Sequence, residues 1–168
     1  MDRFPLPASA AYSYQQNFTT EHHGIDLMAP LGTPVLAVES GVAWASVETK
    51  GGNVVYLDGA RTGNRYFYGH LDRFAAKVLI NADPRVRVDA GDELGYVGTT
   101  GNAAGRPPHV HFQMRRGSLV MDPFEPLQKV DPQPRRGSSG PTVHRQQRPS
   151  GAAAAFCLLA LLWLVAKR

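Results

Sequence analysis

Hydrophobic and polar residues in the first 128 positions alternate over short distances. Runs of β-branched and aromatic residues recur at a spacing of roughly 8–12 residues, with turn-forming residues between them, which is typical of an all-β sandwich or barrel. The best candidate for a helix, Asp72–Leu79, is short. The pattern therefore predicts an all-β, antiparallel fold whose strands lie at Thr33–Val38, Val42–Val47, Asn53–Leu57, Arg65–Tyr68, Arg85–Val88, Leu94–Val97 and His109–Met114.

The pattern changes after residue 128, and we predict three parts: a domain at 1–128, a linker at 129–150 and an apolar helix at 151–168. The linker is rich in Pro, Gly, Ser, Arg and Gln, which have little to bury. The apolar run from Ala152 to Ala166 has 15 residues. A bilayer core requires about 20 residues, but Lys167 could extend to the interface. We expect a membrane anchor or a sorting tail here, with docking of the helix elsewhere as the alternative.

Charge and cysteine content narrow the possible functions. The net charge of +4 is unevenly distributed along the chain. Residues 1–128 carry 11 Lys and Arg and 13 Asp and Glu, whereas residues 129–168 carry seven Lys and Arg and one Asp. A nucleic-acid partner would require basic residues clustered on the folded domain, so none is expected. The single cysteine, Cys157, excludes an intrachain disulfide, so the core or a metal ion must hold the fold. No apolar signal peptide is visible at the N-terminus.

Histidines are the main candidates for metal ligands and catalytic residues. Five of the six lie in the predicted domain, in the segments Glu21–Asp26, Tyr68–Leu71 and His109–Phe112, whereas His144 lies in the linker and is expected to be solvated. Imidazole and carboxylate groups are ordinary zinc ligands, and a catalytic zinc site has three protein ligands and one open position.

Strand geometry predicts which of these side chains share a face. Residues two apart point the same way in an extended segment. His109 and His111 would then lie together, opposite an apolar core face. The same rule puts His22 and Asp26 on one side, and the missing side chain of Gly24 between them would leave room for an ion.

These motifs and their surroundings resemble the lysostaphin-type (LytM-domain) peptidoglycan zinc metalloendopeptidases. The resemblance runs in order over about 100 residues and ends near Asp122-Pro123. It is carried by His22-His23-Gly24-Ile25-Asp26-Leu27, Ala29-Pro30-Leu31-Gly32-Thr33-Pro34-Val35, Gly51-Gly52-Asn53-Val54-Val55, Tyr68-Gly69-His70-Leu71, Thr100-Gly101-Asn102 and Pro108-His109-Val110-His111-Phe112.

The resemblance implies a fold, a site and an activity. The fold would be the antiparallel sandwich or open barrel of these peptidases, also described as a duplicated hybrid motif. One Zn²⁺ would be bound by His22, Asp26 and His111, with His70 and His109 as catalytic residues. His23 is the alternative to His22 as a ligand. The substrate would be peptide cross-links or stem peptides of bacterial peptidoglycan.

The sequence leaves three questions open. The chain has no HExxH motif, so His109 is the best candidate for general base, and His70 would orient the water or hydrogen-bond the oxyanion; the sequence does not settle which histidine is the base. Relatives that have lost ligands activate other wall hydrolases, so a non-catalytic binding or activating domain is the alternative function. We expect a location in the cell envelope, and the sequence leaves the oligomeric state unknown.

Overall fold

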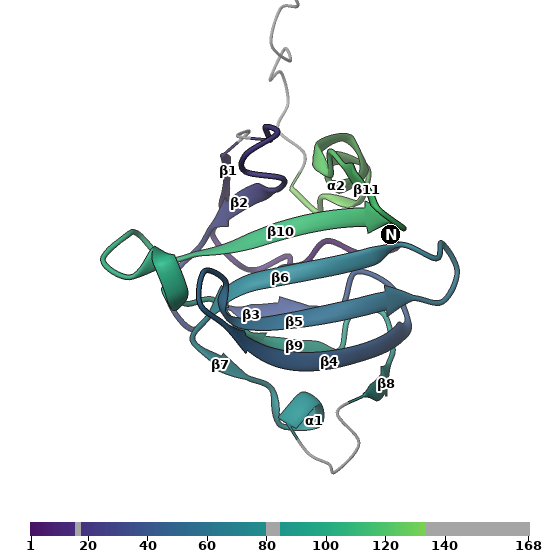
Figure 1. The fold of residues 1–168 in the computed structure, drawn as a ribbon, viewed down its shortest axis with the longest axis horizontal. Helices are drawn as coiled ribbons and strands as arrows, with labels where there is room; N and C mark the ends of the chain where they lie inside the picture. Colours follow the sequence, from purple (N-terminus) through teal and green to yellow (C-terminus); the bar gives the residue numbers. More distant parts are fainter. Residues whose placement is uncertain (16–17, 80–84, 134–168) are drawn as a thin grey trace, which may run out of the picture. The chain divides into compact units, whose positions relative to one another are not determined.

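Two antiparallel sheets form the fold, in a computed structural model that describes residues 1–15, 18–79 and 85–133 (Figure 1). The larger sheet has eight strands in the order β1-β2-β10-β6-β5-β4-β8, with β11 paired to β10, and the smaller has the order β3-β9-β7. The strands are β1 (Ser13–Gln15), β2 (Ile25–Met28), β3 (Pro34–Leu36), β4 (Gly41–Glu48), β5 (Gly52–Gly59), β6 (Arg65–Leu71), β7 (Arg73–Phe74), β8 (Val86–Val88), β9 (Glu93–Tyr96), β10 (His109–Arg116) and β11 (Leu119–Met121). The helices are α1 (Ala76–Leu79), α2 (Phe124–Val130) and the 3-10 turn η1 (Gly101–Ala103). The predicted antiparallel all-β class is confirmed.

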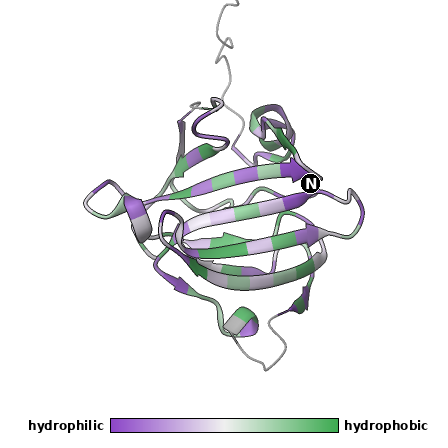
Figure 2. Cartoon of the chain, in the orientation of Figure 1, coloured by the Kyte–Doolittle hydropathy of each residue, from purple (hydrophilic) through white to green (hydrophobic). Residues whose placement is uncertain are grey.

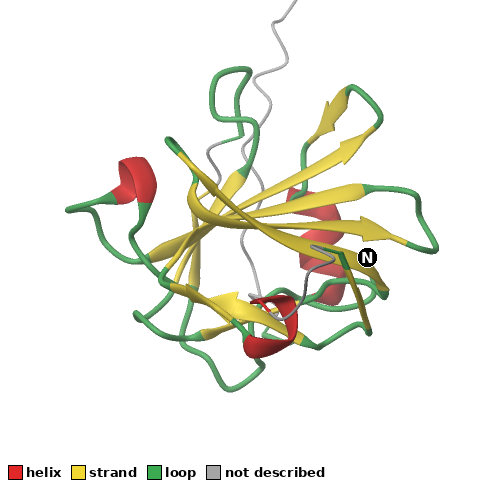
Figure 3. Cartoon of the chain, turned by 60° about the horizontal axis from the view of Figure 1, so that its bottom comes forward, coloured by secondary structure: helices red, strands yellow, loops and turns green. Residues whose placement is uncertain are grey.

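One hydrophobic core joins the two sheets, and the alternation along the strands decides which side chains enter it. Hydrophobic and hydrophilic bands alternate along strands of the large sheet (Figure 2), as expected when one face of a sheet is buried. The smaller sheet and the helices can be followed in the view of Figure 3. The fully buried core side chains of the larger sheet include Ile25, Leu27, Val55, Leu57, Tyr66, Tyr68, Val110 and Phe112, and those of the smaller sheet include Val35 and Leu94.

Strand β10 lies between β2 and β6, and its register brings distant segments together. His111 pairs with Asp26 on β2 and with Gly69 on β6, while His109 pairs with Met28. Because Val110 and Phe112 face the core, His109 and His111 face the opposite side, as predicted. The buried face of β10 therefore fixes the position of both histidines.

All seven predicted strands overlap observed ones, but the helix predicted at Asp72–Leu79 is largely wrong. Arg73–Phe74 forms β7, which pairs with Gly95 and Tyr96 of β9, and helix remains only at Ala76–Leu79. A helix of one turn has little stability of its own, so pairing with β9 prevails over the local preference. The strands β1 and β11 and the helix α2 were not predicted from the sequence.

The folded unit continues beyond residue 128. Helix α2 extends to Val130, and the hydroxyl of Tyr14 donates a 2.6 Å hydrogen bond to Asp131 Oδ2. Most of the predicted linker and the whole apolar run at 151–168 lie outside the described residues. In the described part of the chain, no helix is long and apolar enough to cross a membrane.

Candidate metal centre

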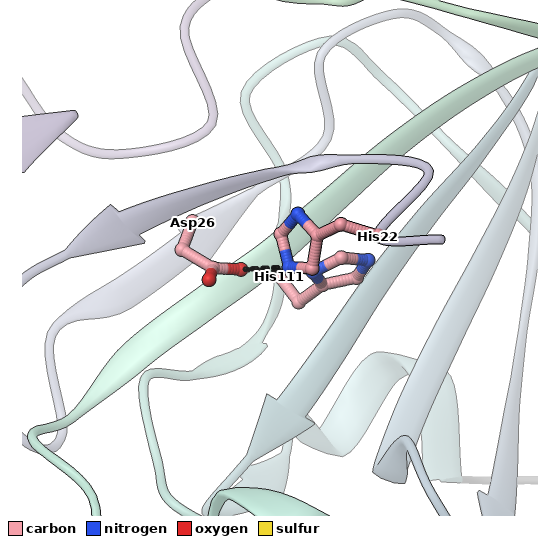
Figure 4. Close-up of side chains that lie close together, drawn as sticks. All are labelled: His22, Asp26 and His111. Carbon is pink, nitrogen blue, oxygen red and sulfur yellow. Dashed lines mark hydrogen bonds and ion pairs between the residues drawn. The ribbon is translucent and has the colours of Figure 1, made fainter. Parts of the chain in front are cut away.

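His22, Asp26 and His111 form a triad at one end of a groove on the large sheet. Each offers a ligand atom, and these atoms all lie within 4.8 Å of one another. Asp26 Oδ1 lies 3.2 Å from His22 Nε2 and 2.8 Å from His111 Nδ1 (Figure 4). Among the residues that the structure describes, no other three His, Cys, Asp or Glu side chains lie close enough together to hold a metal ion. The structure thus brings together the three residues to which the sequence analysis gave the role of ligands.

Different local structures hold the triad. Asp26 and His111 are directly opposed on β2 and β10, so sheet pairing alone sets their separation. His22 precedes β2 in a turn, where its backbone N–H donates to Thr19 Oγ1 at 3.0 Å. The segment around His22 is therefore a turn and not the extended chain assumed from the sequence, although His22 still reaches Asp26.

Gly24 makes the close approach of its own backbone to His111 possible. A Cβ at this position would meet the backbone oxygen of Phe112 at 2.7 Å and the Cε1 and Nε2 atoms of His111 at 2.8 Å. The missing side chain therefore makes room for the imidazole ring of His111. Whether Gly24 also leaves room for an ion between His22 and Asp26 stays a prediction.

The donor atoms of the triad fit a divalent cation. The Nδ1–H of His22 donates to the carbonyl oxygen of Gly24 at 3.0 Å, so the neutral ring presents the lone pair of Nε2 to Asp26 Oδ1. Two acceptors 3.2 Å apart attract each other only with a cation between them, either a proton or a metal ion. Two imidazole nitrogens and one carboxylate oxygen, with a groove on the open side, form a ligand set typical of zinc.

His70 reaches the same groove because β6 is irregular at this point. The register between β5 and β6 shifts between Asn53 and Val55, and His70 has a positive φ of 63°. Regular alternation would turn His70 to the core side, with Tyr66 and Tyr68, whereas a bulge re-aims a side chain. The strained backbone is paired nonetheless, since the N–H of His70 donates to the carbonyl oxygen of Gly51 at 2.8 Å.

His70 and His109 share the same tautomer and lie side by side. Nδ1 of His70 donates to the carbonyl oxygen of Thr100, and Nδ1 of His109 donates to that of Pro107, both at 2.9 Å. The neutral rings therefore keep an unprotonated Nε2, the form that accepts a proton. Their ring centroids are 4.9 Å apart, and the His70 ring is 5.9 Å from that of His111.

The surroundings of His70 lower the pKa of its imidazole ring. Burial lowers the pKa of His70 most, the positive forms of His109 and His111 lower it further, and the hydrogen bond to Thr100 opposes them. The net effect favours a neutral ring at neutral pH. A neutral His70 accepts a proton at Nε2, whereas hydrogen bonding to an oxyanion, one of its two expected roles, would require the imidazolium form.

The groove has a volume of about 560 Å³, and all five predicted site residues line it. His23 also lines it, in a left-handed conformation with φ of 60°, but lies outside the triad. Gln113 and Arg115 also line the groove but were not predicted from the sequence, although the period of two along β10 places them on the same face as His109 and His111. The roles of the carbonyl oxygens of Thr100 and Pro107 could not be predicted from the sequence, because every residue type has a carbonyl oxygen.

Gln113 contacts His111 on the side away from Asp26. Gln113 Nε2 lies 2.8 Å from His111 Nε2, so the amide donates and the ring proton is on Nδ1, facing Asp26 Oδ1. When His111 Nδ1 binds a metal ion, the ring proton must be on Nε2 instead. The side-chain amide of Gln113, turned by about 180°, then accepts a hydrogen bond from this Nε2–H with its oxygen. Gln113 can therefore orient the His111 ring in both forms.

Replacing Gln113 with leucine should weaken zinc binding about 10- to 100-fold, the range typical when a partner of a ligating histidine is lost. Competition with a chromophoric chelator would measure the affinity. Gln113→Glu keeps an acceptor for the Nε2–H and should retain the affinity. Equal zinc affinity in the leucine variant and the parent would show that Gln113 has no role in orienting His111.

Comparisons with known proteins agree with this geometry. The model of peptidase family M23 matches residues 20–123. The chain is 37% identical over 103 residues to the DD-carboxypeptidase/endopeptidase Mpg of Neisseria meningitidis, covering 61% of this chain and 22% of the relative. It is 34% identical over 123 residues to the glycyl-glycine endopeptidase ALE-1 of Staphylococcus capitis, covering 71% and 30%.

Solved structures show the same fold. The structure of the antimicrobial peptidase lysostaphin from Staphylococcus simulans aligns with a TM-score of 0.61 and 28% identity, over 82% of this chain and 57% of that one. The chain thus spans less than a third of the length of both curated relatives. The family match covers the segment that contains the triad, His70 and His109. From the sequence match and the shared fold together, the chain belongs to peptidase family M23.

Proposed function

We propose that this chain is a zinc-dependent endopeptidase that hydrolyses peptide bonds in bacterial peptidoglycan. The observation that carries the proposal is the convergence of His22, Asp26 and His111 beside two further histidines, all five lining one groove. The relatives Mpg and ALE-1 are named for endopeptidase activity, which supports the reaction class. A substrate in the wall places the enzyme in the cell envelope.

The triad would hold one Zn²⁺ through His22 Nε2, Asp26 Oδ1 and His111 Nδ1. Bound there, the ion would act as a Lewis acid that polarises the scissile carbonyl and activates water. The open side of the triad faces the groove, so a peptide lying in it can bring a carbonyl group to this point.

His109 is assigned the proton transfers, and His70 is assigned the orientation of the water. In this assignment His109 Nε2 takes a proton from the attacking water and returns it to the amine nitrogen that leaves. The hydrogen bond to Pro107 holds the ring with Nε2 available for both steps. His70, neutral and fixed by Thr100, accepts a hydrogen bond from the water and orients it. Both histidines are buried, at 7% and 8% exposure, so the transfers occur away from bulk solvent.

Digestion of purified peptidoglycan tests the proposal. The 168-residue chain, loaded with zinc, should release fragments whose masses correspond to cut peptide bonds and intact glycan, and a chelator should stop the release. A zinc-loaded protein that binds peptidoglycan but releases nothing would instead support the alternative, a non-catalytic domain that binds the wall or activates another hydrolase.

A further inference from the structure

Three cross-strand rows contribute side chains to the groove, and they run from the triad toward the other end of β10. The first row pairs His111 with Asp26 and Gly69. The second joins Gln113, Phe67, Tyr56 and Trp44. The third joins Arg115, Arg65 and Asp58. Because residues two apart on a strand share a face, the three rows form one continuous surface.

The third row places two like charges directly opposite each other. Arg115 on β10 pairs with Arg65 on β6, an arrangement that destabilises a sheet unless something compensates. Arg65 is compensated, since its Nε and Nη2 atoms donate to Asp58 at 2.7 and 3.0 Å. The side chain of Arg115 has no such partner, because it forms no ion pair and no hydrogen bond with any residue that the structure describes.

The guanidinium of Arg115 is partly desolvated while it lies in the groove. Its Nε is buried and has no hydrogen-bond partner among the described residues. A buried donor without a partner costs free energy, so such a group marks the place where an acceptor is expected. A guanidinium with several free N–H groups matches a carboxylate, which can accept two parallel hydrogen bonds.

Two further basic side chains of the groove are also available to an anion. Lys50 and Arg106 line it, and neither forms an ion pair with a described residue. Of the acidic residues in the lining, Asp26 belongs to the triad, and Glu48 accepts a 2.5 Å hydrogen bond from the hydroxyl of Tyr56. Glu21 is exposed.

We propose that Arg115 binds a free carboxylate of the substrate peptide, so that the enzyme prefers anionic stem peptides to uncharged bridges. Arg115 lies four positions after His111, a distance of about 13 Å along an extended strand. The carboxylate therefore belongs to a residue three or four positions from the bond that is cut, or to a long side chain nearer to it. The inference rests on the proposed function, because it assumes that the groove holds the peptide.

Binding to matched peptides tests the inference independently of hydrolysis. The probes are stem peptides in which one carboxylate is either free or converted to a carboxamide. One pair differs at the α-carboxylate of the second residue, and another pair differs at the side-chain carboxylate of the diamino acid. Dissociation constants are measured by calorimetry with the full chain in the presence of a chelator, so that no peptide is cut.

The parent should bind the free carboxylate of one pair about tenfold or more tightly than its carboxamide, the usual size of a hydrogen-bonded charge pair. Arg115→Gln should remove this preference without changing carboxamide binding, and Arg115→Lys should keep part of it. Arg116→Gln is the matched control, because Arg116 follows on β10 and instead donates from Nε to Asn64 Oδ1 at 2.9 Å. It should leave the preference intact.

Equal binding of both peptides in each pair, or failure to bind either, would overturn the inference. So would a loss of preference as large in Arg116→Gln as in Arg115→Gln. Cleavage of the same peptides with zinc restored separates the two proposals. Preference without cleavage would contradict the peptidase proposal alone, and equal cleavage of carboxylate and carboxamide peptides would contradict the carboxylate site alone.

Discussion

Replacing His111 with alanine should abolish zinc retention and peptidoglycan digestion together. His111 lies at the centre of the site, because its Nδ1 faces Asp26 and its ring contacts those of His22 and His70. Zinc sites built from four ligands are worth about 10–16 kcal/mol, so the loss of one ligand should weaken binding about 10²–10³-fold. Zinc content after dialysis and the affinity from chelator competition would measure the effect.

The histidine next to His22 provides the matched control. His23 lines the groove but lies outside the triad, and asparagine tolerates its left-handed backbone. His23→Asn should therefore keep both zinc and activity. If it lost zinc while His22→Ala kept it, His23 would be the ligand in place of His22. Far-ultraviolet circular dichroism of each variant would show whether the sheet has formed.

Replacing His109 with alanine should have a different effect: zinc is retained, and kcat falls about 10²–10⁴-fold, as when a general base is removed. The reason is that His109 Nε2 is the proposed proton acceptor, whereas the ligand set does not include this residue. Zinc content and steady-state kinetics on a synthetic stem peptide would separate the two effects.

The corresponding change at His70 should lower kcat as well, since its neutral ring is proposed to orient the water. If His109→Ala lost its zinc, His109 would be a ligand and the roles of His109 and His111 would be reversed. If it kept full activity, His70 or another group would have to be the base.

Much of the fold could be predicted from the sequence, because the core-facing residues of the strands repeat with a period of two. On β10 this repeat also predicted the common face of His109 and His111. The prediction failed at Asp72–Leu79, where an eight-residue segment has no strong local preference and the pairing of β7 with β9 decides the structure. The short strands β1 and β11 depend in the same way on partners distant in the sequence.

The candidate site could also be predicted only in part from the sequence. The resemblance supplied its five residues, but not how the chain positions them. No pattern indicates that His70 leaves the core side of β6 through a bulge with positive φ, because regular alternation would place it with Tyr66 and Tyr68. The turn that holds His22 depends on Thr19, and the contact between Gly24 and the His111 ring depends on the pairing of β2 with β10.

Crystals of the zinc-loaded chain, measured on both sides of the zinc absorption edge, would locate the ion directly. We predict a single anomalous difference peak about 2.0–2.2 Å from His22 Nε2, a carboxylate oxygen of Asp26 and His111 Nδ1. A strong peak at other residues, with these three side chains bound to no ion, would contradict both the metal centre and the hydrolysis that depends on it.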